Sequence, residues 1–177
     1  MAMLPGAGYL GKGWGKAREP HHMPFANLPR PVVVLGLSGW LPQAICLWLV
    51  LAGGPLGWSA LAAGCFYAAL ILSFLGGMWW MTALLRGARH AEIYVAAVLP
   101  SLIGLGALLP WTVGWNWPGP ALAVLGALLL ASPLVDKWLS RMVELPAGWL
   151  ALRMVMAGGL GTLTLALAWA EQGLAGR

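Results

Sequence analysis

Charged residues are scarce in this chain of 177 residues. Asp, Glu, Lys and Arg together make up 8% of the sequence, whereas a soluble domain contains about 25%. Hydrophobic residues make up 60%, and the mean hydropathy is +0.81. This composition excludes an ordinary soluble domain, and it excludes a wholly disordered chain, which needs low hydrophobicity and high charge. An integral membrane protein is the class that remains.

Cysteine and histidine are also few. Two cysteines cannot form a disulfide scaffold. Cys46 and Cys65 are expected at similar depth in the first two apolar stretches, where two thiols without a third ligand make a poor metal site. The three histidines, His21, His22 and His90, lie at or outside the ends of these stretches. None can therefore hold a haem or a chlorophyll between helices, and we expect no metal site.

Sequence patterns of catalysis are missing too. There is no Gly-rich phosphate loop with its Lys, and no Ser, His and Asp that could meet inside a membrane. No carboxylate or histidine is expected at mid-membrane, which disfavours a proton-coupled transporter. Ten Lys and Arg cannot both coat a nucleic-acid groove and orient a membrane protein. We expect no catalytic residue, no enzyme activity and no nucleic-acid partner.

Long apolar runs are what the sequence does contain. A membrane helix needs about 20 mostly apolar residues, and five stretches meet or approach that length. They cover residues 31–51, 58–85, 93–109, 120–135, where Asp136 is the expected stop, and 148–169. The runs are continuous and rich in Leu and Ala. The sequence therefore predicts an all-α, polytopic bundle of five transmembrane helices in residues 31–177.

Basic residues alternate between the segments that connect these stretches. Nine lie on one side and only Arg177 lies on the other; the nine are Lys12, Lys16, Arg18, Arg30, Arg86, Arg89, Lys137, Arg141 and Arg153. The positive-inside rule predicts a cytoplasmic N-terminus and an outside C-terminus. Residues 1–30 form a Pro/Gly-rich cytoplasmic tail without a signal peptide's apolar segment. This tail is either flexible or docks on a partner. The expected location is a bacterial inner membrane, or the mitochondrial inner membrane in a eukaryote.

Ten of the twelve tryptophans fall at the predicted membrane boundaries. Aromatic belts of this kind anchor helices at the level of the lipid headgroups. Trp40 falls near mid-membrane, where its indole N–H needs a partner. Trp111, Trp115 and Trp117 are dense enough for a lid over an outer cavity, as an alternative to simple anchoring.

Polar residues fall into two predicted groups. An interfacial charge network is expected to tie helix ends together on the cytoplasmic side, or to bind an anionic lipid or a partner. Its members are Arg86, Arg89, Glu92, Asp136, Lys137, Arg141 and Arg153. A midplane cluster is expected from Gln43, Tyr67, Ser101 and Thr162, with Ser38 and Ser73 pairing one turn lower. Such hydrogen bonds favour helix packing, and a small polar pocket is the alternative.

The stretch from Tyr67 to Trp80, which reads YAALILSFLGGMWW, resembles the signature of the DUF3429 family of small membrane proteins. Ser73, Phe74, Gly76 and Gly77 carry the motif, and the similarity extends over residues 32–169. The chain departs from the family at Met78-Trp79-Trp80, where one Trp commonly follows a polar or basic residue. The resemblance implies a small multi-helix membrane protein, and the family has no established activity.

Three functions agree with these patterns. The first is an accessory or assembly subunit that packs against a larger energy-converting membrane complex. The second is a binder of a lipid, a quinone or a tetrapyrrole. For this second function there is an analogy: the chain is similar in length, helix number and tryptophan content to the TspO tryptophan-rich sensory proteins. The Trp/Pro-rich motifs of that family are missing from it. The third is a small oligomeric transporter, which the lack of midplane charge disfavours.

Overall fold

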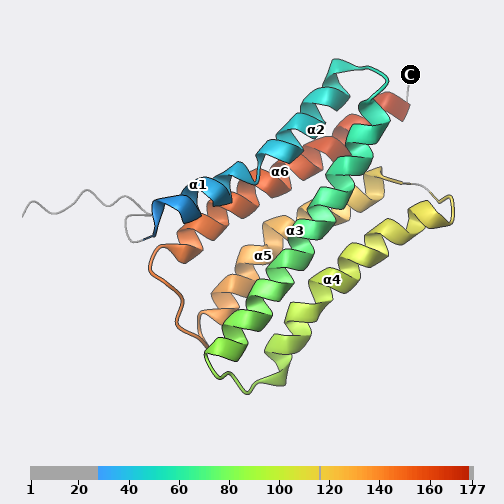
Figure 1. The fold of residues 1–177 in the computed structure, drawn as a ribbon. Helices are drawn as coiled ribbons and strands as arrows, with labels where there is room; N and C mark the ends of the chain where they lie inside the picture. The colour runs from blue at the N-terminus through green and yellow to red at the C-terminus, as the bar shows by residue number, and fades with distance from the viewer. Residues whose placement is uncertain (1–27, 116, 176–177) are drawn as a thin grey trace, which may run out of the picture.

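The computed structural model describes residues 28–115 and 117–175. The predicted tail, residues 1–27 in particular, therefore lies outside the described residues. The described chain is all-α (Figure 1) and contains α1 (Arg30–Ser38), α2 (Leu41–Ala52), α3 (Gly57–Leu85), α4 (Ala91–Thr112), α5 (Gly119–Leu139) and α6 (Trp149–Ala175).

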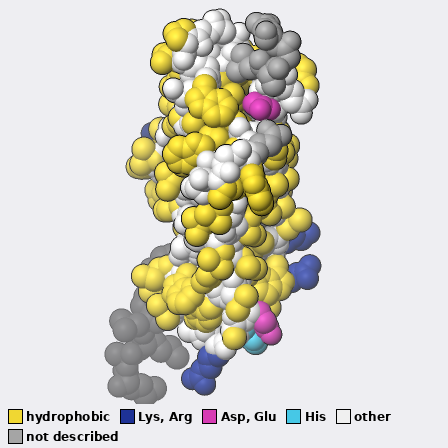
Figure 2. Space-filling model, turned by 90° about the vertical axis from the view of Figure 1, so that its right-hand side faces the viewer, with side chains coloured by type: hydrophobic (Ala, Val, Ile, Leu, Met, Phe, Trp, Pro, Cys, Tyr) yellow, Lys and Arg dark blue, Asp and Glu magenta, His cyan; other side chains and the backbone are white. Residues whose placement is uncertain are grey.

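Within residues 28–115 and 117–175, five helical segments are long and apolar enough to cross a membrane. The first, Arg30–Ala52, consists of α1 and α2 in succession, and α3, α4, α5 and most of α6 supply the others. The predicted number of helices that could span a membrane agrees with this count. Apolar side chains cover most of the face shown in Figure 2, and most of the Lys and Arg side chains visible there lie in its lower half. A surface this rich in exposed Leu, Val and Trp is suited to contact with lipid.

The structure corrects two predicted boundaries. The span predicted as one helix over 31–51 is interrupted at Gly39 and Trp40, because Pro42 has no N–H to donate to the carbonyl of Ser38. The stop predicted at Asp136 is also wrong, since α5 continues through Asp136 to Leu139. A carboxylate that is hydrogen-bonded inside the bundle has no need to reach water, and Asp136 is such a carboxylate.

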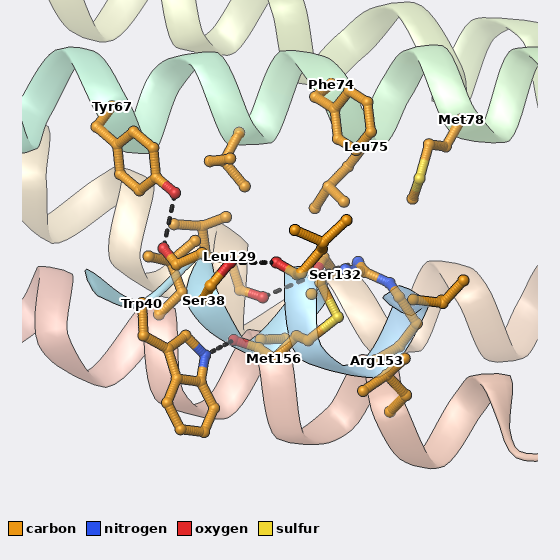
Figure 3. A pocket seen from close by; sticks show the side chains of 18 of the residues that line it. Ser38, Trp40, Tyr67, Phe74, Leu75, Met78, Leu129, Ser132, Arg153 and Met156 are labelled. Atoms are coloured by element: carbon orange, nitrogen blue, oxygen red, sulfur yellow. Dashed lines mark hydrogen bonds between the residues drawn. The ribbon is translucent and has the colours of Figure 1, made fainter. Parts of the chain in front are cut away.

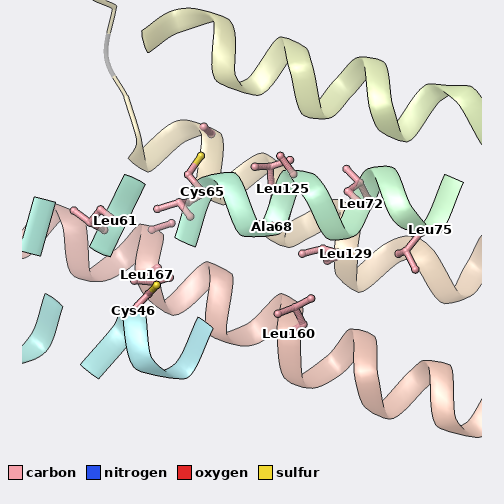
Figure 4. Packing of buried hydrophobic residues seen from close by; sticks show 14 of the residues in the cluster. Cys46, Leu61, Cys65, Ala68, Leu72, Leu75, Leu125, Leu129, Leu160 and Leu167 are labelled. Carbon is pink, nitrogen blue, oxygen red and sulfur yellow. The ribbon is translucent and has the colours of Figure 1, made fainter. Parts of the chain in front are cut away.

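The central helix is α3, which contacts α2, α4, α5 and α6 (Figure 1). Most of its larger buried side chains follow alternating steps of four and three residues, as do those of α5. In α3 this series includes Leu61, Cys65, Ala68, Leu72, Leu75 and Trp79; in α5 it includes Leu122, Leu125, Leu129, Ser132, Asp136 and Leu139. This spacing places each set along one face of its helix. The two faces, with Leu160 and Leu167 of α6, form the core (Figure 4).

Glycines allow the closest helix contacts. Gly126 of α5 and Gly161 of α6 face each other, and a Cβ on either would come within 3.2 Å of the other's carbonyl oxygen. Gly76 of α3 lies directly against the carbonyl of Ala97 in α4, with the ring of Pro100 beside it. The neighbouring Gly77 has no atom within 4 Å of its Cβ position. The two glycines of the motif therefore have different environments.

We predict that Gly76→Ala destabilises the protein and that Gly77→Ala does not. A methyl group at Gly76 must push α4 away, and overpacking of this kind costs about 1–3 kcal/mol. The same methyl group at Gly77 meets open space and removes a helix-interior glycine, which favours the helix by about 0.5–1 kcal/mol. Thermal unfolding of both variants in mild detergent checks this. Equal melting temperatures for the two variants would contradict the close packing of α3 on α4.

Candidate functional site

A buried ion pair joins α5 to α6. Arg153 Nε donates to Asp136 Oδ2 over 2.8 Å, and each residue is 2% exposed. The other carboxylate oxygen, Oδ1, accepts a hydrogen bond of 2.8 Å from Trp79 Nε1 of α3. Both oxygens of Asp136 are thus bound, and three helices meet at one carboxylate. Because removing one partner would leave a buried charge uncompensated, the pair resists any movement of these helices apart.

Arg153 also reaches a hydroxyl group. Its Nη2 donates to Ser132 Oγ over 3.2 Å, and that hydroxyl donates in turn to the carbonyl of Leu129 over 2.8 Å. The remaining nitrogen, Nη1, donates no hydrogen bond to a described residue. A guanidinium group carries five N–H donors. Arg153 therefore keeps donors that no described residue occupies, and it lines an open space.

That space is a cavity of about 580 Å³. Residues of α1, α3, α5 and α6 line it, and most of the lining side chains are apolar, such as Leu35, Phe74, Leu75, Met78 and Met156 (Figure 3). Within the part of the chain that the structure describes, Arg153 is the one ionisable side chain in the lining apart from Tyr67. The cavity is thus an apolar chamber with a cationic group in its wall.

The other polar side chains of this chamber donate hydrogen bonds to backbone carbonyls. Tyr67 Oη donates to the carbonyl of Gly39 over 2.7 Å, and Ser38 Oγ donates to that of Leu35 over 2.8 Å. Trp40 Nε1 donates to the carbonyl of Met156 in α6 over 3.0 Å (Figure 3). The indole ring of Trp40 lies on Gly159, where no side chain could fit. The partner that the sequence requires for Trp40 is therefore a backbone carbonyl.

A second cavity, of about 390 Å³, lies next to Asp136. Trp79, Arg86 and Glu144 are also among its lining residues. Met78 and Trp149 line both cavities. Of the two partners in the ion pair, Arg153 thus lines the larger cavity and Asp136 lines the second one.

Only two of the seven residues in the predicted charge network meet. Asp136 and Arg153 form the single ion pair within the part of the chain that the structure describes. The other five are exposed and form no ion pair there; they are Arg86, Arg89, Glu92, Lys137 and Arg141. These five lie near helix ends, where water can solvate them. The partners of the buried pair that sequence reasoning missed are Trp79 and Ser132. Both residues follow the four-and-three spacing of the buried faces of α3 and α5, and this spacing could have identified them.

The predicted midplane residues do not form one cluster. Gln43 Nε2 donates to Thr164 Oγ1 over 2.9 Å, and both residues are fully buried. Thr162 instead donates to carbonyls of its own helix and is exposed. Ser101 bonds Ser73 over 2.8 Å, so Ser73 pairs with α4 and not with Ser38. Packing between α2 and α6, and between α3 and α4, is what these hydrogen bonds support.

Four aromatic residues at the opposite end, Trp58, Phe66, Trp111 and Trp117, contact one another. Trp117 is buried and lies 6.0 Å from Trp58 and from Phe66 between ring centroids, and 5.8 Å from Trp111. Trp115, which was predicted in the same group, is exposed. Cys46 and Cys65 are free thiols in the core. Among the described residues, no three His, Cys, Asp or Glu side chains converge on a possible metal position.

The chain belongs to the DUF3429 family, described as a protein family of unknown function, because the family model matches residues 28–170. The predicted resemblance is thereby confirmed over most of the chain. No curated protein and no solved structure matches the chain. Of the motif residues, Gly76 packs on α4, Ser73 bonds Ser101, and Phe74 lines the larger cavity.

We predict that Asp136→Ala destabilises the bundle strongly, by about 3–5 kcal/mol, because it leaves Arg153 buried without its counter-ion. The double substitution Asp136→Asn with Arg153→Gln removes both charges and should recover most of that loss. The adjacent Lys137→Gln, at an exposed position, should change stability by no more than about 0.5 kcal/mol. Unfolding of the purified variants in detergent measures the differences. A double variant as unstable as Asp136→Ala would show that the charges themselves are not the stabilising element.

Proposed function

We propose that this DUF3429 protein is a multi-pass membrane protein that binds an amphiphilic small molecule in the cavity between α1, α3, α5 and α6. One observation carries the proposal: the cavity of about 580 Å³ has Arg153 in an otherwise apolar wall. Small-molecule sites are typically about 300–1,000 Å³, mostly apolar, with a few placed polar groups. An empty apolar cavity would leave the N–H groups of this guanidinium without acceptors, which is unfavourable.

We further propose that binding is the activity and that no covalent chemistry occurs. The hydroxyl groups of Ser38, Tyr67 and Ser132 donate to backbone carbonyls, so no base activates them. The charge of Arg153 is balanced by Asp136. A guanidinium group that is paired with a carboxylate suits ligand recognition, because it can donate hydrogen bonds without taking part in a reaction.

The orientation belongs to the same proposal. Arg86, Arg89, Lys137 and Arg141 lie at the ends of α3 and α5 or in the segments that follow them, and basic residues favour the cytoplasmic side. We place that end in the cytoplasm of a bacterial cell, or in the mitochondrial matrix of a eukaryotic one. Arg153, one turn into α6, then lies at the level of the inner leaflet, where the head of a membrane amphiphile would be.

An accessory role in a larger membrane complex is our second proposal. It is supported by a shallow groove of about 360 Å³ between α4 and α5, whose lining includes Gly106, Ala107 and Pro110. No atom lies within 4 Å of the Cβ position of Gly106. Small residues on an exposed helix allow close approach of another helix, so a partner subunit could pack there.

Native mass spectrometry of protein extracted in mild detergent from its own membrane tests the first proposal. We expect the wild-type chain to carry a small molecule in near one-to-one ratio. Ala157→Phe, which fills the cavity from α6, should abolish that mass. Val155→Phe, at an exposed position of the same helix, should retain it and thus serves as the matched control.

Other outcomes of this experiment decide against the proposal. Retention of the small molecule by Ala157→Phe at the wild-type level would place the ligand elsewhere. A chain without any small molecule, isolated with other subunits in fixed ratio, would support the accessory role instead.

A further inference from the structure

We infer that the ligand of this cavity has an uncharged head with a carbonyl oxygen, as in a quinone or an ester, and that Arg153 Nη1 recognises that oxygen. The inference rests on the proposed function and specifies the chemical class of its ligand. It follows from which donors of Arg153 are occupied and from the balance of charge around them.

The available groups are donors. Nε of Arg153 is bound to Asp136 and Nη2 reaches Ser132, while Nη1 has no partner among the described residues. Arg153 lines this cavity, and its guanidinium group lies beside Ser132 in the close view (Figure 3). A head that only donates hydrogen bonds would leave these N–H groups unsatisfied. The ligand must therefore present an acceptor.

The balance of charge excludes most charged acceptors. Asp136 and Arg153 are both buried and neutralise each other at 2.8 Å, and no other cationic side chain among the described residues lines the cavity. An anionic head would add a negative charge that nothing in the chamber compensates, next to the carboxylate of Asp136. A charge buried without its counter-ion is strongly unfavourable. A carbonyl oxygen accepts the same hydrogen bonds without that cost, and a cationic head would be repelled by the guanidinium group.

The rest of the chamber suits an apolar tail. Along α6 the lining extends from Trp149 through Arg153 to Leu160. Beyond the arginine, the N–H and O–H groups of Trp40 and Tyr67 are bound to backbone carbonyls, so they offer no second polar anchor. The ligand thus has its head at Arg153 and its chain among Leu35, Phe74 and Met156.

Two probes with equal tails separate these chemistries. Decylubiquinone carries two carbonyl oxygens and no charge, and decyl phosphate carries an anionic head on the same ten-carbon chain. Isothermal titration calorimetry of each into the full chain in lipid nanodiscs, against empty nanodiscs, gives the two affinities. We expect decylubiquinone to bind at least about tenfold more tightly, because only the anionic head adds an uncompensated charge beside Asp136.

Variants assign the recognition to Arg153. The double variant Asp136→Asn with Arg153→Gln removes the guanidinium donors together with both charges, and we expect its affinity for decylubiquinone to fall at least about tenfold, as for the loss of one hydrogen bond to a charged donor. Lys137→Gln should keep the wild-type affinity. Wild-type affinity of the double variant for decylubiquinone would overturn the role of Arg153, and the wild-type comparison of the two probes remains decisive even where the double variant fails to fold.

The failures are distinguishable. Equal or tighter binding of decyl phosphate by the wild-type chain would overturn the neutral-head inference and leave the proposed function standing. Absence of binding by either probe, together with native protein that carries no small molecule, would overturn both.

Discussion

The carboxylate of Asp136 is the point on which this structure depends. It accepts hydrogen bonds from Trp79 of α3 and Arg153 of α6, and it belongs to α5. A carboxylate almost without exposure is tolerated only when its charge is paired and its oxygens are bound. The three helices must therefore keep their rotation and depth at this end. Farther along, apolar contacts that follow the same four-and-three spacing continue the arrangement through Leu129, Leu125 and Leu122.

The cavity is a consequence of how the first span is built. Pro42 interrupts the helix, and the freed backbone at Gly39 is bound by Tyr67. The short helix α1 then packs on α6, where Gly36 lies against Met156, and no residue of α1 is buried. The space beside Arg153 is left unfilled by this arrangement. A rigid ion pair and a loosely packed neighbouring helix together create a chamber with one fixed polar wall, which is the basis of the proposed binding role.

The fold could be predicted from the sequence because it follows from hydropathy and charge. Five apolar runs predicted the five helices among the described residues that are long and apolar enough to span a membrane, and the motif around Gly76 identified the family. The polar contacts could be predicted only in part, because depth along a helix does not give rotation about it. Thr164 and Thr162 are two residues apart, which turns them about 200° from each other, so one is buried with Gln43 and the other is exposed. Depth along the helices likewise grouped Asp136 and Arg153 in one predicted network with five other charged residues. Those five are exposed, whereas Asp136 and Arg153 lie on helix faces that turn into the bundle.

The central claim is that the chamber beside Arg153 is a ligand site, and a crystal structure of protein purified from its own membrane tests it most directly. We predict electron density for an elongated molecule between α1, α3, α5 and α6, with an oxygen within hydrogen-bond distance of Arg153 Nη1. Side chains of α1 that fill this space, or a protein acceptor on Nη1 with no ligand density, would contradict the account.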